Sequence, residues 1–235
     1  MKWELECKQE QKTIRFRERS AVPHNKKVTY GRIVASLRPH KVEKHRVRLT
    51  IGGNLLDYDG DASTPTTDLT TTKVFINSVI STNKARLATT DIENFYLNND
   101  LPESEWMKLP LEIIPTEIIQ QYNLDKLSDN GWVYIEILKA MYGLKQSGKI
   151  AYDELVKHSK PFGYSPTKHT PGYWRHNIKP ISFVLYANDF AIKYTNNNDL
   201  NHLLQVLQTK YTITTYLTGS LYCGITLKWN YNKSM

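Results

Sequence analysis

Residues 183–194 read Phe-Val-Leu-Tyr-Ala-Asn-Asp-Phe-Ala-Ile-Lys-Tyr, and this stretch decides how the rest of the chain is interpreted. Two short hydrophobic runs, residues 183–187 and 190–194, flank the polar pair Asn188 and Asp189. Such an arrangement is typical of a β-hairpin with a polar turn. The stretch therefore predicts a buried hairpin that carries an acidic residue at its tip.

A second aspartate follows another predicted strand. Residues 91–97 read Asp-Ile-Glu-Asn-Phe-Tyr-Leu and continue a strand predicted over residues 86–92. A single aspartate at a strand end is most often a turn former or a cap. Two carboxylates from separate strands can instead hold Mg²⁺, which prefers oxygen ligands. We expect Asp91 and Asp189 on neighbouring strands of one antiparallel sheet, close enough to share divalent ions.

Strands and helices alternate irregularly along the remaining chain. Hydrophobic alternation predicts further strands over residues 28–36, 46–51 and 132–138, and a closing strand pair within 221–229. Helical patterns cover residues 68–81, with Asp68 as the cap, and residues 115–122, 146–161 and 199–210. Residues 1–20 show no clean period. This irregular order predicts an α+β protein with an antiparallel sheet.

Composition excludes several classes of protein. The 235 residues include 40% hydrophobic and 11% aromatic side chains, which argues against intrinsic disorder. The apolar runs are too short to span a membrane, and no secretory signal opens the chain. The two cysteines, Cys7 and Cys223, form no disulfide framework and no zinc motif. We expect an intracellular protein of the cytoplasm or nucleus, without the phosphate loop or catalytic motifs of the common hydrolases.

The positive charge is concentrated at the start of the chain. Residues 1–50 contain 14 basic and five acidic side chains, a net charge of +9, whereas residues 51–235 carry a net charge of −1. Clustered lysine and arginine favour a polyanionic partner, because phosphates release counterions on binding them. A solvated basic face without a partner would show the same pattern.

Four motifs in order resemble one known family. They are the D-I-x-N-F-Y-L of residues 91–97, the M-Y-G-L-K-Q-S-G of 141–148, the L-Y-A-N-D-F of 185–190 and the L-Y-C-G-I-T-L-K-W of 221–229. Together they are similar to the reverse transcriptase of copia-type long-terminal-repeat retrotransposons, over about residues 22–230. The resemblance implies an RNA-directed DNA polymerase from a retrotransposon polyprotein.

The resemblance also implies a fold and a set of partners. The fold is the right-hand polymerase of fingers and palm, with helices packed on an antiparallel palm sheet and the thumb absent. Residues 1–21 would form a tail or frayed helix, 22–84 a fingers-like basic region and 85–235 a palm-like region, with fingers elements recurring within 100–150. The partners are an RNA or DNA template and primer and deoxynucleoside triphosphates, with no membrane. The oligomeric state stays open.

Individual roles follow from the same resemblance. Asp91 and Asp189 match catalytic aspartates that bind two Mg²⁺ ions, or Mn²⁺ in their place, and Asn188 lies where a further catalytic residue is found. Nucleotide binding is assigned to Arg46, Arg48, Tyr96 and Gln146, and the primer grip to Tyr222 and Gly224. Each nucleotide-binding residue has a simpler interpretation, as a solvated strand charge for the arginines, a core aromatic for Tyr96 and a helix start for Gln146.

Asn188 departs from the family pattern. The family has two adjacent aspartates, whereas this chain has Asn188 before Asp189. One pair of unit charges at 4 Å is worth about 4 kcal/mol at an effective dielectric constant near 20. The missing charge therefore predicts impaired nucleotidyl transfer. The alternative is a non-catalytic retroelement remnant that binds nucleic acid through its basic N-terminal region.

Overall fold

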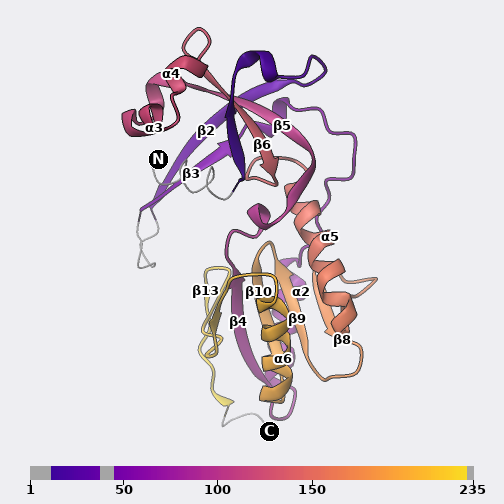
Figure 1. Cartoon of the computed structure of the whole chain (residues 1–235). Helices are drawn as coiled ribbons and strands as arrows, with labels where there is room; N and C mark the ends of the chain where they lie inside the picture. Colours follow the sequence, from indigo (N-terminus) through magenta and orange to yellow (C-terminus); the bar gives the residue numbers. More distant parts are fainter. Residues whose placement is uncertain (1–11, 38–44, 232–235) are drawn as a thin grey trace. The chain divides into compact units, whose positions relative to one another are not determined.

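The computed structural model describes residues 12–37 and 45–231, and the chain divides into two units (Figure 1). The first unit comprises residues 1–63 and 96–151, and the second comprises residues 64–95 and 152–235. Each unit is thus assembled from two separate stretches of chain. The functional division expected at residues 22–84 and 85–235 stays a prediction, and residues 1–11 of the expected tail lie outside the described residues.

The first unit is built on a five-stranded sheet with the order β1-β6-β5-β2-β3. Its neighbours pair antiparallel except β2 and β5, which run parallel. The helical turns α3 and α4 connect β5 to β6, and the described residues of this unit also form four 3₁₀ turns. The bounds are β1 Ile14–Arg17, η1 Arg19–Ala21, β2 Val28–Leu37, β3 His45–Ile51, η2 Gly53–Leu55, η3 Tyr96–Asn98, β5 Asp100–Pro110, η4 Leu111–Ile113, α3 Thr116–Gln121, α4 Leu124–Leu127 and β6 Trp132–Lys139.

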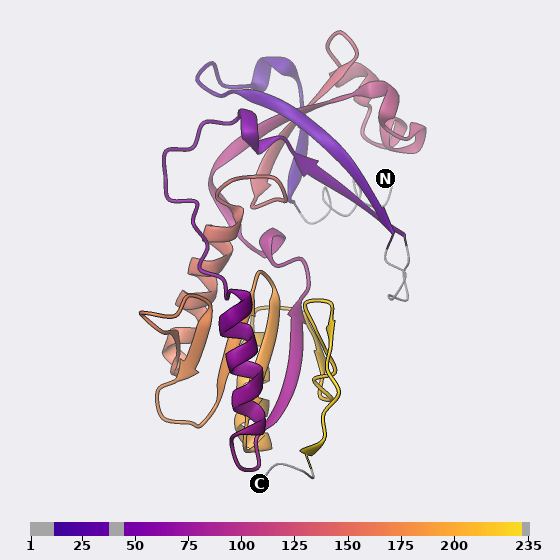
Figure 2. The same cartoon turned by 180° about the vertical axis from the view of Figure 1, so that it is seen from behind.

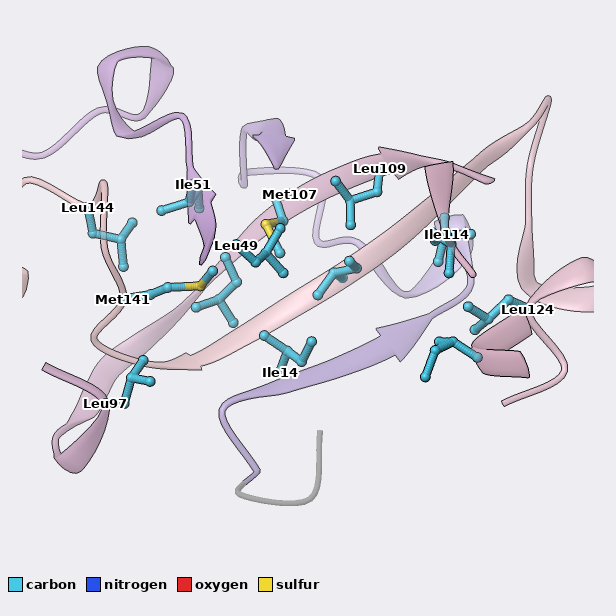
Figure 3. Close-up of a cluster of buried hydrophobic side chains, with 14 of the residues drawn as sticks. Ile14, Leu49, Ile51, Leu97, Met107, Leu109, Ile114, Leu124, Met141 and Leu144 are labelled. Atoms are coloured by element: carbon cyan, nitrogen blue, oxygen red, sulfur yellow. The ribbon is translucent and has the colours of Figure 1, made fainter. Parts of the chain in front are cut away.

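Aliphatic side chains from distant parts of the chain form the core of the first unit (Figure 3). Ile14 of β1, Leu49 of β3 and Met107 of β5 are at most 2% exposed and belong to one cluster. Burial of this apolar surface is the main term that stabilises the unit, at about 25 cal/mol per Å². The predicted strands over residues 28–36 and 46–51 are confirmed as β2 and β3.

Two strands of this sheet were not predicted. Ile14–Arg17 is strand β1, where the sequence indicated a tail or frayed helix over residues 1–21. Asp100–Pro110 is strand β5, which carries acidic residues and prolines and shows no regular alternation. Both strands exist because each pairs with β6, and such long-range pairing leaves no local signal.

The second unit is built on a six-stranded antiparallel sheet with the order β11-β4-β10-β9-β8-β7, beside a small β12–β13 hairpin. The predicted strand over residues 86–92 is confirmed as β4, and the predicted hairpin as β9 and β10. The bounds are β4 Arg86–Ile92, β7 Tyr164–Pro166, β8 Tyr173–His176, β9 Ser182–Tyr186, β10 Asp189–Tyr194, β11 Ile213–Tyr216, β12 Leu221–Tyr222 and β13 Ile225–Thr226.

Helices α2 (Leu69–Ile80) and α6 (Asn197–Gln208) lie on opposite faces of this sheet (Figures 1 and 2). Asp68 caps α2 as predicted, since its carboxylate accepts a hydrogen bond from the Thr71 N–H at 2.7 Å. Asn196 caps α6 in the same way, by accepting from the Asn198 N–H. The central strands are therefore covered on both sides, in agreement with their nearly continuous hydrophobic sequence.

Helix α5 (Ser147–Ser159) is the element in which the first unit ends and the second resumes, and the 3₁₀ turn η5 (Lys160–Phe162) follows it. It is the longest helix in the described ranges, with 13 residues. No helix there combines the length and the hydropathy that a bilayer span requires.

The predicted fold class is wrong. The sequence indicated an α+β right-hand polymerase of fingers and palm, with helices packed on an antiparallel palm sheet and no thumb. The described chain is mixed α/β and mostly β-sheet, and one sheet is a curled half-barrel. The prediction assumed that strands pair with antiparallel neighbours. The parallel pairing of β2 with β5, in register at Val28 and Trp106, breaks that assumption and makes the first sheet mixed.

Candidate functional site

Asp91 and Asp189 lie directly opposite each other at one end of the second unit's sheet. They are Cα partners in the antiparallel pair of β4 and β10. Directly opposed residues of an antiparallel pair project from the same face, and side chains alternate along each strand. Both carboxylates therefore share the face of Leu87 and Ala191, which belong to the core beneath α2. The prediction that the two aspartates lie on neighbouring strands is confirmed.

The turn before Asp189 is held in an unusual backbone conformation. Tyr186 and Asp189 close the hairpin as Cα partners, so the loop consists of Ala187 and Asn188. Ala187 has φ = +53°, a left-handed conformation that costs a residue with a Cβ atom about 1–2 kcal/mol. Strain of this kind persists only where surrounding contacts determine the conformation, and it occurs often at functional sites.

Asn188 supplies the contacts that fix this turn against β4. Its backbone carbonyl accepts a hydrogen bond from the Ile92 N–H at 3.2 Å, and its side-chain Nδ2 donates to the Ile92 carbonyl at 3.3 Å. The same Nδ2 also donates to Oδ1 of Asp91. The amide thus occupies one direction of approach to the Asp91 carboxylate. A cation that binds this oxygen must compete with it.

The β12–β13 hairpin borders Asp189. Its turn residues Cys223 and Gly224 have φ values of +47° and +79°, as a two-residue hairpin turn with two left-handed positions requires. Tyr222, which is 2% exposed, anchors the hairpin in the core with Ala191. The Cys223 Sγ lies 4.0 Å from Oδ2 of Asp189 and is a weak donor to it. Loss of solvation and the Asp189 charge raise the pKa of the Cys223 thiol to about 11.

The contact of Cys223 with Asp189 was missed by sequence reasoning. Its only signal was its place between Tyr222 and Gly224, which were themselves assigned to the primer grip. A thiol with a raised pKa stays protonated at neutral pH. Cys223 is therefore a neutral neighbour of Asp189 and adds no negative charge to the site.

The donor set of this site fits a hard divalent cation. Mg²⁺ is commonly held by one or two carboxylates and completes its shell with water and substrate phosphates. Asp91 and Asp189 provide two such carboxylates, and Asn188 has a side-chain carbonyl oxygen. Within residues 12–37 and 45–231, no group of three or more histidine, cysteine or acidic side chains could hold a metal ion. The site has the chemistry for Mg²⁺ but few protein ligands to hold it.

Arg48, Tyr142 and Tyr96 form a small cluster within the first unit. The guanidinium carbon of Arg48 lies 4.4 Å from the centroid of the Tyr142 ring, in a cation–π contact. The Tyr96 ring packs edge-on against Tyr142, with 5.0 Å between centroids. Nε of Arg48 is buried and has no hydrogen-bond partner among the described residues. Tyr142 was not singled out from the sequence, although it belongs to the motif at 141–148.

Arg46 and Gln146 also belong to the first unit. Arg46 pairs with Ser36 across the β2–β3 hairpin. Gln146 is 6% exposed, lies one residue before α5 and accepts the Ile150 N–H with its backbone carbonyl. Its side-chain Nε2 donates to Oε1 of Glu105 at 3.3 Å, and burial raises the pKa of that glutamate.

The predicted site residues thus occur in two sets. The second unit brings together Asp91, Asn188 and Asp189, and Tyr222 and Gly224 flank Cys223 in the hairpin that contacts Asp189. The first unit carries the four residues assigned to nucleotide binding, which are Arg46, Arg48, Tyr96 and Gln146. Their roles stay predictions. No model of a known protein family matches the chain.

Proposed function

We propose that the chain acts as an RNA-directed DNA polymerase domain of a retrotransposon polyprotein, in which template-primed nucleotidyl transfer is impaired. The proposal rests on the four ordered motifs and on one structural observation. That observation is the direct pairing of Asp91 with Asp189 while the Asn188 amide donates to Asp91. The pairing of the two carboxylates supports the polymerase function. The hydrogen bond from the Asn188 amide to the Asp91 carboxylate supports its impairment.

Asp91 and Asp189 would hold Mg²⁺, or Mn²⁺ in its place, in this function. The ions would stabilise the charge that develops on the transferring phosphoryl group and on the attacking and leaving oxygens. The protein's own contribution is to fix the two carboxylates on adjacent, well-buried strands. Asn188 weakens binding of the metal ion in two ways. Its side chain carries no negative charge, and its Nδ2 donates a hydrogen bond to the Asp91 oxygen that the ion would bind.

The partners in this function are an RNA or DNA template, a primer and deoxynucleoside triphosphates, and we place the protein in the cytoplasm or nucleus. In the first unit, Arg48 and Tyr96 already pack against Tyr142. A guanidinium held over an aromatic ring keeps its charge and a restricted orientation, which suits recognition of a phosphate. Gln146 is bound to Glu105, so a nucleotide would have to replace that contact.

The alternative function is a non-catalytic nucleic-acid-binding protein that uses the basic N-terminal region. The contact of Asn188 with Asp91 favours it, because the amide satisfies the carboxylate without a metal ion. Both functions predict nucleic-acid binding, and only the first predicts primer extension.

Primer extension by the full chain separates these two functions. The unmodified protein, Asn188→Asp, and Asn188→Asp combined with Asp91→Asn are compared with Mg²⁺ and with Mn²⁺. We expect background extension by the unmodified protein and a gain in Asn188→Asp that is lost in the double variant. Nucleic-acid binding without extension by any variant would favour the alternative. Strong extension by the unmodified protein, abolished by Asp91→Asn alone, would contradict the impairment.

A further inference from the structure

A cluster of aromatic and charged side chains lies in the second unit, where β7, β8 and α6 meet. The His176 ring packs edge-on against the Tyr164 ring at 4.8 Å and lies 5.9 Å from the His202 ring. The fully buried Tyr164 shares a hydrogen bond of 2.9 Å between its hydroxyl and Nδ1 of His202. None of these residues contributes to the proposed polymerase function.

His176 ends β8 and holds the turn that leads to β9. Its Nδ1 lies 3.0 Å from the Ile178 backbone nitrogen and 2.9 Å from that of Lys179, and both N–H groups donate to it. A backbone N–H can only donate, so Nδ1 must be the unprotonated nitrogen and the ring proton must reside on Nε2. The turn geometry therefore requires a neutral imidazole.

The turn is also connected to α6. Nζ of Lys179 lies 3.1 Å from Oδ1 of Asp199, which is 8% exposed in the first turn of α6. Ile178, between the two bound amides, is 87% exposed. The His176 ring thus organises a turn that displays one apolar side chain outward and directs one lysine to α6.

We propose that His176 is a proton-sensitive latch, which holds the Ile178 and Lys179 amides of the turn when neutral and releases them when protonated. Protonation places an N–H on Nδ1 opposite two backbone N–H groups, so both hydrogen bonds are lost. Release of the Lys179 amide also removes one restraint on the lysine that reaches Asp199.

The surroundings of His176 determine the pH at which the latch opens. Burial lowers the pKa of His176 most, and the neighbouring His202 of α6 and Lys179 of the turn lower it further. The Phe162 carbonyl and Asp199 raise the pKa of His176. The Tyr164 ring of β7 packs against the imidazole. The folded pKa is thus below the ordinary value of 6.5. The stabilisation that neutral His176 gives to the fold is complete above the ordinary pKa of 6.5 and is lost as the pH falls through the folded pKa.

Amide exchange and backbone NMR of the full chain between pH 8 and 5 test the latch. On acidification, exchange of the Ile178 and Lys179 amides, corrected for intrinsic pH effects, should accelerate by about tenfold, and both signals should shift with the His176 ring. His176→Asn keeps a side-chain acceptor but does not titrate, so both amides should stay protected throughout. His169→Asn, at an exposed position, is the matched control and should behave as the unmodified protein.

Two results would overturn this proposal. One is that the Ile178 and Lys179 amides stay equally protected while the His176 ring signals show it becoming protonated. The other is that His176→Asn retains the acid-induced exchange of the unmodified protein, which would place the titrating group elsewhere. Circular dichroism at pH 8 checks that each variant is folded before the titration.

Discussion

Three neighbouring residues, Ala187, Asn188 and Asp189, show how an amide beside two carboxylates sets the chemistry of a turn. An aspartate at position 188 would place two carboxylates side by side, which is unfavourable unless a cation lies between them. The asparagine removes that repulsion and adds hydrogen bonds to Asp91 and Ile92. The turn is therefore stabilised without a metal ion. Position 188 carries no negative charge that would attract a metal ion.

The left-handed conformation of Ala187 leads to a prediction about stability. Ala187→Gly removes a Cβ atom from a residue with φ = +53°, and we expect the free energy of unfolding to rise by up to about 1 kcal/mol. Chemical denaturation measures this change. The matched control is Ala191→Gly, at a fully buried position of the adjacent strand, which should lower stability by about 1 kcal/mol or more. Destabilisation by Ala187→Gly would show that the turn is not strained.

At the scale of elements, the sequence predicted the helices and strands that are marked by a local pattern, such as a cap, an alternation or a polar turn. Asp68 as a cap predicted α2, and the hydrophobic alternation in residues 28–36 predicted β2. A hydrophobic run interrupted by a polar pair predicted the β9–β10 hairpin. Strands β1 and β5 could not be predicted in this way, because their existence depends on pairing with β6. The fold class was wrong because the parallel pairing of β2 with β5 is also long-range and leaves no local signal.

The same division applies to the candidate site. The pairing of Asp91 with Asp189 could be predicted because each residue lies at the end of a hydrophobic strand. The contacts of Asn188 with Asp91 and of Cys223 with Asp189 depend on turn geometry, which the sequence pattern does not specify. Likewise, the packing of Arg48 on Tyr142 joins residues that are far apart in the chain.

Strand β1 supplies a test at this scale. Ile14 is fully buried in the core of the first unit, so Ile14→Ala should lower the free energy of unfolding by about 2–4 kcal/mol. Leu37→Ala, at a position that is 65% exposed in β2, is the control and should change stability by less than about 0.5 kcal/mol. Equal effects of the two substitutions on thermal or chemical unfolding would mean that β1 does not belong to the stable sheet.

At the scale of the whole molecule, charge and site chemistry are divided along the chain. The net charge of +9 lies in residues 1–50, whereas the aspartate pair belongs to the second unit. Contacts to phosphate depend on charge and carry little base information. Nucleic-acid binding and metal-dependent chemistry should therefore respond to different substitutions.

Charge reversal tests this division. Arg46→Glu combined with Arg48→Glu should weaken binding of a labelled oligonucleotide and reduce its dependence on salt, because fewer counterions are released. Reversal of the exposed Lys168 and Arg175 to glutamate changes the net charge equally and should have a smaller effect. Fluorescence anisotropy between about 50 and 200 mM salt measures both effects. Binding that is insensitive to salt over this range would exclude the electrostatic mechanism.

The central claim is that Asp91 and Asp189 form a cation site whose affinity is limited by Asn188, and calorimetric titration of the full chain with Mg²⁺ tests it most directly. A restored carboxylate near the ion is worth several kcal/mol, so Asn188→Asp should bind Mg²⁺ at least about tenfold more tightly than the unmodified protein. Addition of Asp91→Asn should abolish that gain. Equal Mg²⁺ affinities of the unmodified protein and Asn188→Asp would contradict the claim, because the turn would then not face a cation site.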